Sequence, residues 1–198
     1  MARKRLPWLA EAERIDLAVY AAVAATPTPR LDGFMRRLSE AANYSRLSLA
    51  SSAVLALCGG PRGRAAAVYG LASVGVTATV VNLLIKPLGR RARPDPVASV
   101  PRVRLVRTPK SRSFPSGHTA AAVAFASGAG QQLPLAAIPL HVLAVLVGYS
   151  RVHTGVHYPG DVLGGALIGS VLAEITTGAL DGRLRVPDQP QTDNPTSD

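Results

Sequence analysis

The sequence predicts an all-α membrane protein, a polytopic bundle of about five transmembrane helices preceded by amphipathic helices. Two observations predict this fold. Hydrophobic residues make up 47% of the 198-residue chain, and they gather into long runs whose interiors lack charge, apart from Glu174 in the last run. Polar residues capable of chemistry cluster at the ends of these runs. The expected spans are 46–60, 65–85, 118–132, 134–150 and 161–180.

A set of buried helices in a soluble protein is the alternative to a membrane bundle. Five apolar runs leave few amphipathic faces to meet water, which disfavours that alternative. Small residues are frequent within the runs, and they allow helices to approach closely in lipid. Gly164, Gly165 and Gly169 in the last run are examples.

The ends of the chain differ in composition from its centre. Near the N-terminus we expect helices at 11–25 and 31–44, both lying at the membrane interface, with Trp8 as an anchor. The C-terminal residues are polar and rich in proline, and we expect them to be disordered. The chain therefore divides into an N-terminal interfacial segment (1–45), a transmembrane domain (46–180) and a polar tail (181–198).

The formal net charge of +10 allows two interpretations of the protein's partners. A soluble basic protein would suggest nucleic acid as a partner. In a membrane protein, Lys and Arg gather in cytoplasmic loops and anion sites, so we expect no nucleic-acid partner here. Cys58 is the single cysteine, which excludes an intrachain disulfide and a cysteine-based metal site.

A long basic loop, residues 86–114, separates the second and third spans. It holds nine Lys or Arg residues and one acid, Asp95. Lys86 and Arg93 in this loop, and Arg151 at the end of the fourth span, lie at membrane boundaries. Arg suits a two-pronged grip on phosphate oxygens, and Lys acts as a point charge. These three cations are therefore candidate phosphate ligands, and snorkelling side chains are the alternative.

Ser116, Gly117 and His118 precede the alanine-rich third span. Ser116 can cap that helix, and Gly117 lets the backbone come close to a ligand. A helix N-terminus offers free N–H groups to an anion. His118 then lies at the mouth of the same pocket, where its near-neutral pKa suits protonation of a leaving alkoxide.

His157 and Asp161 lie four residues apart, with Tyr158-Pro159-Gly160 between them. Pro159 suits the first turn of a helix. The Asp161 carboxylate could hold one ring nitrogen of His157 and leave the other free to attack phosphorus. A capping aspartate beside an interfacial histidine is the alternative.

The three clusters resemble the three-part signature of the type 2 phosphatidic acid phosphatase (PAP2) superfamily, which includes vanadium haloperoxidases. The matching residues lie in 86–94, 115–118 and 150–161, called here the signature segments. The resemblance implies that His157 attacks phosphorus, Asp161 orients it and His118 protonates the leaving group. It also implies that no metal or cofactor is needed. The implied phosphate ligands are Lys86, Arg93, Ser116, Gly117 and Arg151.

The resemblance further implies a lipid phosphate substrate in the bilayer and a metal-independent phosphoric monoester hydrolase. Decaprenylphosphoryl-5-phosphoribose, phosphatidate, phosphatidylglycerophosphate and polyprenyl diphosphate are all expected candidates. Alternative activities are a lipid-linked phosphotransferase, a non-catalytic anionic-lipid-binding protein and a vanadate-dependent haloperoxidase. An intact set of His118, His157 and Asp161 disfavours simple binding, which needs no nucleophile.

Charge distribution predicts the orientation in the cell membrane. With five spans, the signature segments and residues 1–45 share one face, which carries 18 of the 22 Lys and Arg residues. The positive-inside rule therefore predicts a cytoplasmic active site.

Four other polar positions carry weaker expectations. We expect His153 to lie at the interface or the substrate entrance, and His141 to hydrogen-bond within the bundle. Asn43 could reach lipid headgroups, and Arg91 is expected to attract anionic lipid generally.

Overall fold

The computed structural model describes residues 7–89, 91–108 and 111–184, and helices are the only regular secondary structure in these ranges. The predicted polar tail beyond residue 184 lies outside them. The short helical turns are η1 (Asn43–Ser45), η2 (Val80–Ile85), α5 (Lys86–Leu88), α6 (Pro96–Ser99) and η3 (Arg102–Arg104). The longer helices are α1 (Pro7–Ala25), α2 (Pro29–Ala41), α3 (Arg46–Cys58), α4 (Gly60–Thr79), α7 (Gly117–Gln132), α8 (Pro134–His153) and α9 (Pro159–Leu184).

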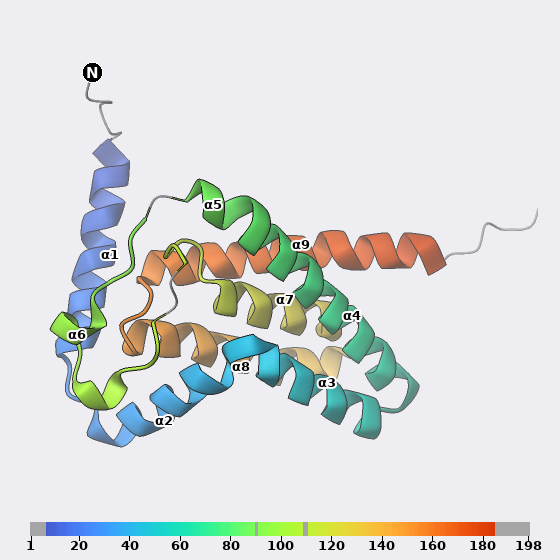
Figure 1. The fold of residues 1–198 in the computed structure, drawn as a ribbon. Coiled ribbons are helices and arrows are strands. Elements are labelled where there is room, and N and C mark those ends of the chain that lie inside the picture. The colour runs from blue at the N-terminus through green and yellow to red at the C-terminus, as the bar shows by residue number, and fades with distance from the viewer. Residues whose placement is uncertain (1–6, 90, 109–110, 185–198) are drawn as a thin grey trace, which may run out of the picture.

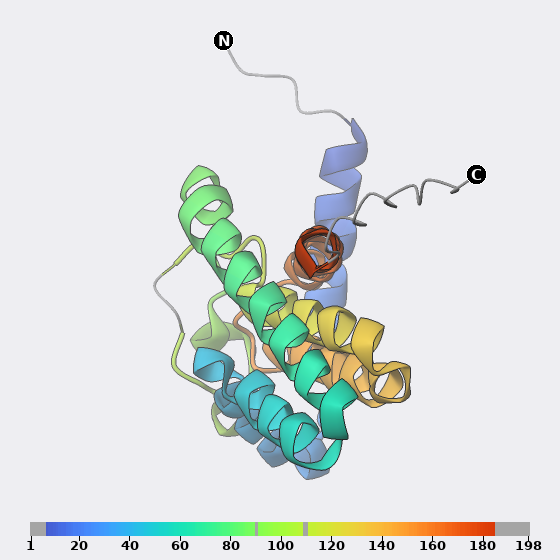
Figure 2. The same cartoon turned by 90° about the vertical axis from the view of Figure 1, so that its right-hand side faces the viewer.

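Helix α7 is the centre of the bundle. It packs against α4, α8 and α9, and α3 packs against α4 on the outside. Figure 2 views α9 end-on, with α4 crossing the bundle at a steep angle. Helix α1 stands crosswise to α9 at the end where α9 begins (Figure 1). The all-α bundle predicted from the sequence is confirmed.

Glycines bring α9 into backbone contact with α7. A Cβ atom at Gly165 would lie 2.5 Å from the carbonyl oxygen of Ser116, and one at Gly169 would lie 2.3 Å from that of Ala120. Real Cβ atoms do not come so close, so only glycine fits at this helix crossing. The predicted use of small residues for close packing is confirmed at these two positions.

Within the part of the chain that the structure describes, three helical segments are long and apolar enough, by length and composition, to cross a membrane. They are Gly60–Leu88, Pro134–His153 and Pro159–Gly182. The two other expected spans are helices too, but α3 has 13 residues and α7 has 16. At about 1.5 Å per residue, neither covers a hydrocarbon core of about 30 Å by itself.

The two expected N-terminal helices are present as α1 and α2. Polar side chains point inward from both: Asp16 on α1, and Asp32 and Ser39 on α2, are buried. Burial of polar groups requires partners. Several of those partners, including Arg91, Arg151 and His153, lie in the signature segments, so α1 and α2 pack against these segments.

Candidate active site

The three signature segments meet at one end of the bundle. Lys86 follows η2, a π-helical turn that continues α4, and such turns are frequent at functional sites. Helix α7 begins at Gly117, α8 ends at His153 and α9 begins at Pro159. These three ends lie together on the side of the molecule where α1 stands (Figure 1). Segments up to 75 residues apart in sequence therefore surround one site.

His157 and Asp161 form the predicted pair. His157 Nδ1 lies 3.4 Å from Asp161 Oδ2, and both side chains are fully buried. The carboxylate also accepts the Ser113 hydroxyl, at 2.5 Å, and the backbone N–H of Tyr158, at 2.9 Å. A carboxylate held by several donors keeps its charge and its orientation. Asp161 is thereby fixed on the Nδ1 side of the His157 ring.

The opposite nitrogen of His157, Nε2, lies 2.8 Å from Arg93 Nη1. Arginine can only donate, so Nε2 accepts this bond through its lone pair and Nδ1 carries the proton toward Asp161. Burial lowers the pKa of His157 to about 4; the hydrogen bond to Asp161 opposes this, and the charge of Arg93 adds to it. The ring is therefore neutral at pH 7, with the electron pair that a nucleophile needs on Nε2.

Arg151 is a buried cation with unused hydrogen-bonding capacity. Its Nη1 donates to both the carbonyl and the hydroxyl oxygen of Ser39, each at 2.8 Å. Its Nε and Nη2 are buried without a partner among the described residues. Leaving such donors unsatisfied costs about 1–3 kcal/mol, more for charged groups. Two free N–H donors on one guanidinium suit a tetrahedral oxyanion.

The two remaining cations approach the same place. Arg93 is held by backbone carbonyls, at 2.8 Å from Ser111 and 2.8 Å from Val156. Lys86 Nζ lies 3.3 Å from the Ser111 hydroxyl. A Cβ atom at Gly117 would come within 3.3 Å of Lys86 Nζ. Glycine at this position therefore keeps open the space between Lys86 and the N-terminus of α7.

The second signature segment adopts the expected cap. Ser116 is the N-cap of α7 and accepts the N–H of Thr119. Its own N–H donates to the backbone carbonyl of Asp161 at 2.9 Å, which ties the start of α7 to the start of α9. His118, in the first turn of α7, lies with Nε2 at 3.0 Å from Asn43 Oδ1. All eight predicted site residues thus lie on elements that converge here.

Four contributors to this site were not predicted. Ser113 reaches Asp161, Ser39 holds Arg151, and Asn43 meets His118 rather than a headgroup. Arg91 contacts Asp161 at 3.0 Å, so the expectation of general lipid attraction misses its specific contact. Arg91 lies within the first signature segment and Ser113 two residues before the second, which is a weak signal. Nothing in the local sequence marks Ser39 or Asn43.

His153 differs from the expectation of an interfacial position. It is buried, and its Nε2 lies 3.0 Å from Asp32 Oδ1, which also accepts from Arg104 Nε at 2.8 Å. Arg104 is fully buried and donates to the carbonyl oxygen of Thr26 at 2.6 Å. This buried cluster of Asp32, Arg104 and His153 joins α2, the basic loop and α8. A structural role explains it.

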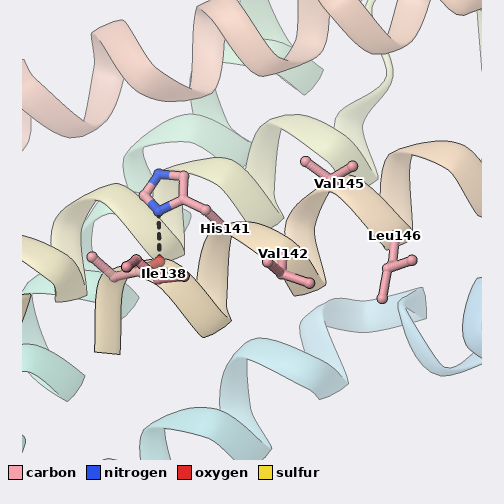
Figure 3. A pocket seen from close by; sticks show the side chains of 6 residues that line it. Ile138, His141, Val142, Val145 and Leu146 are labelled. Carbon is pink, nitrogen blue, oxygen red and sulfur yellow. Dashed lines mark hydrogen bonds between the residues drawn. The ribbon is translucent and has the colours of Figure 1, made fainter. Parts of the chain in front are cut away.

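An apolar groove runs along α8, away from the signature segments. Its volume is about 430 Å³, and Ala137, Ile138, Val142, Val145 and Leu146 line it together with His141. Figure 3 shows His141 turned back onto its own helix, where Nδ1 lies 2.8 Å from the carbonyl of Ala137. Its Nε2 meets Ser127 of α7 at 3.3 Å, so the predicted bonding within the bundle is confirmed.

The fold and the site define a class: a helical membrane-type protein with a buried histidine–aspartate pair beside Arg93 and Arg151. Comparison with known proteins agrees. The profile of the PAP2 superfamily matches residues 65–184, which is more than half of the chain. The chain belongs to the PAP2 superfamily, and the resemblance inferred from the signature is confirmed.

Relatives and solved structures give more detail. The chain is 39% identical over 113 residues to decaprenylphosphoryl-5-phosphoribose phosphatase of Mycobacterium tuberculosis, covering 54% of this chain and 58% of that protein. It is 32% identical over 98 residues to undecaprenyl-diphosphatase BcrC of Bacillus subtilis, covering 50% of each. The matched region thus spans about half the length of these relatives.

The structural likeness extends further along the chain. The crystal structure of a transmembrane PAP2 type phosphatidylglycerolphosphate phosphatase from Bacillus subtilis aligns with a TM-score of 0.65 and 27% identity. That alignment covers 88% of both chains. The structural alignment therefore covers more of the chain than the family profile, which matches residues 65–184.

Proposed function

We propose that this protein is an integral membrane phosphatase that hydrolyses a lipid phosphate through a phosphohistidine intermediate. The observation that carries the proposal is the pairing of a neutral, Asp161-bonded His157 with the two free donors of buried Arg151. The nucleophile and the oxyanion ligand then lie at the same end of the bundle, where the charge of Arg151 acts on the His157 ring. Membership in a family with lipid phosphatases among the relatives supports the same activity.

The reaction would proceed in two displacements. In the first, the Nε2 lone pair of His157 forms a bond to phosphorus, the phosphorus–oxygen ester bond breaks, and His118 gives its proton to the departing alkoxide. In the second, His118 takes a proton from water, whose oxygen attacks phosphorus and frees His157 together with inorganic phosphate. Lys86, Arg93 and Arg151 would hold the phosphate oxygens throughout.

Arg93 has a part in the first step that follows from its contacts. Its guanidinium occupies the Nε2 lone pair in the free protein. A phosphate oxygen is a stronger acceptor for an arginine than a neutral imidazole nitrogen. Substrate phosphate would therefore draw Arg93 away and release the nucleophile as it binds.

A panel of lipid phosphates tests the activity and ranks the substrates. Decaprenylphosphoryl-5-phosphoribose, phosphatidate, phosphatidylglycerophosphate and undecaprenyl diphosphate would be offered to purified protein in detergent with EDTA. We expect phosphate release from at least one lipid, because the charged ligands of the site are protein side chains. Release no greater than from a mock purification of cells lacking the protein would contradict the proposal.

We further propose that the protein spans the cell membrane several times with its active site on the cytoplasmic face. The support is the charge distribution: Arg62, Arg64, Arg183 and Arg185 are the only cations on the opposite face of a five-span arrangement. We expect Arg107→Cys, in a Cys58→Ser background, to resist an impermeant maleimide in intact cells and to react in inverted vesicles. Labelling in intact cells would contradict this orientation.

A further inference from the structure

A second carboxylate, Asp16 of α1, lies one ion pair away from the dyad. Arg91 joins the two acids: its Nη1 donates to Asp161 Oδ1 at 3.0 Å, and its Nη2 donates to Asp16 Oδ2. The Asp16 side chain is 10% exposed and that of Arg91 28% exposed, so solvent screens the three charges only in part. Asp16 belongs to the segment that the family profile does not cover.

Asp16 also holds the start of the helix that carries Asp161. Its Oδ1 accepts the backbone N–H of Gly160 at 2.6 Å. A Cβ atom at residue 160 would lie 3.0 Å from the Asp16 carboxylate, so glycine permits this approach. Arg91 in turn lies over the ring of Tyr158, 4.1 Å from its centroid. These contacts fix Asp16 and Arg91 relative to Asp161 from two directions.

The balance of charge gives Asp16 a task beyond holding α1 in place. Without Asp16, the positive charge of Arg91 would neutralise the Asp161 carboxylate. Asp161 would then stabilise a positive charge on the His157 ring only weakly. With Asp16 present, the three groups together carry one net negative charge next to the His157 ring. Phosphorylation of a neutral imidazole makes that ring positively charged. A net negative charge on the Asp161 side of the ring therefore stabilises this intermediate.

We propose that Asp16 is a positioning residue for the phosphatase reaction: by neutralising Arg91, it leaves the Asp161 carboxylate able to stabilise the positive charge that develops on His157. The inference rests on the proposed function. It adds a residue of α1, outside the signature segments, to the machinery of the reaction.

Asp16→Asn is the first test, because asparagine keeps the size and the hydrogen bond to Gly160 but removes the charge. We expect kcat for dioctanoyl phosphatidate to fall about 10-fold or more, with KM within about 3-fold, because the lost stabilisation arises only as the ring becomes charged. A kcat within about 2-fold of the unmodified protein would overturn the inference.

A compensating double variant separates charge balance from mechanical support. Asp16→Asn combined with Arg91→Gln restores one net negative charge at Asp161, and the glutamine amide can still donate to that carboxylate. We expect the double variant to recover at least about 3-fold of the kcat lost in Asp16→Asn. If Asp16 only anchors α1, removing Arg91 as well would lower kcat further, and that result would overturn the inference.

The pH profile gives an independent readout. The charged or titratable groups facing the His157 ring are Asp161 from α9, Arg151 from α8, His118 from α7 and Arg93 from the basic loop, and both variants retain all four. Loss of a negative charge disfavours the protonated ring, so the acidic limb of kcat/KM should move to lower pH in Asp16→Asn. If the substitution instead loosened the site and admitted water, the acidic limb of kcat/KM would move to higher pH, toward the ordinary histidine pKa.

Controls distinguish this inference from the proposed function. Glu11→Gln makes the same charge change on the same helix at an exposed position, and its kcat should be unchanged. Thermal unfolding in detergent would establish that each variant is folded. If the unmodified protein releases no phosphate, the proposed function fails. If it turns over and Asp16→Asn matches it, only the role of Asp16 fails.

Discussion

Replacing His157 with alanine is expected to lower phosphate release by about 10⁴-fold or more, because no other group can form the covalent intermediate. The unprotonated Nε2 of His157 lies next to a cation suited to phosphate, with Arg93 Nη1 at 2.8 Å. Rapid acid-free quenching after mixing with labelled phosphatidate should trap a base-stable phosphohistidine in the unmodified protein and none in the variant.

His141→Ala is a matched control for that experiment. It makes the same substitution on α8, where His141 lines the apolar groove and bonds to Ser127 and the Ala137 carbonyl. We expect its turnover to stay within about 3-fold of the unmodified protein. Labelled phosphoprotein in His157→Ala, in an amount equal to the unmodified protein, would contradict the assignment of the nucleophile.

The second large effect is expected at Arg151. Arg151→Ala removes a cation whose free Nε and Nη2 suit two phosphate oxygens, and we expect kcat/KM to fall about 10³-fold. Arg151→Lys keeps the positive charge but loses the bidentate geometry of the guanidinium, and we expect kcat/KM to fall about 10²-fold. The inhibition constant of inorganic phosphate should rise in both variants, which reports binding separately from turnover.

An exposed arginine provides the control for the lysine substitution. Arg37→Lys on α2 makes the same chemical change where the side chain faces solvent, and its kinetics should match the unmodified protein. Full activity of Arg151→Lys would contradict bidentate phosphate binding by Arg151, since a single point charge would then be sufficient for turnover. Ser39 keeps its contact with Thr154 in both Arg151 variants, and a loss of folded structure would appear separately as a lower unfolding temperature.

The sequence predicted the helices and the reacting groups because both depend on local patterns. Apolar runs predicted the positions of α3, α4, α7, α8 and α9. The predicted ends differ from the observed ends by only a few residues, which is small compared with the length of each helix. The spacing of His157 and Asp161 across Pro159 predicted their pairing, because four residues span one helical turn. Ser116 was predicted as a cap for a similarly local reason.

The supporting residues could not be predicted, because their partners are distant in sequence. Ser39 and Arg151 are 112 residues apart, and Asp16 and Gly160 are 144 apart. Only the docking of α1 and α2 onto the ends of α8 and α9 creates these contacts. The same cause explains His153: its position near a membrane boundary suggested exposure, whereas Asp32 and Arg104 from other segments bury it.

The glycine contacts between α7 and α9 determine one part of the geometry of the site. Gly165 and Gly169 lock together the two helices that carry His118 and Asp161, so the distance between acid and dyad is set inside the bundle. The described parts of the loop reach the same pair from outside these two helices: Arg91 and Ser113 contact Asp161, and Arg93 contacts His157. Helix packing therefore sets the separation of His118 and Asp161, whereas the charges and hydrogen bonds around Asp161 and His157 depend on the conformation of the loop.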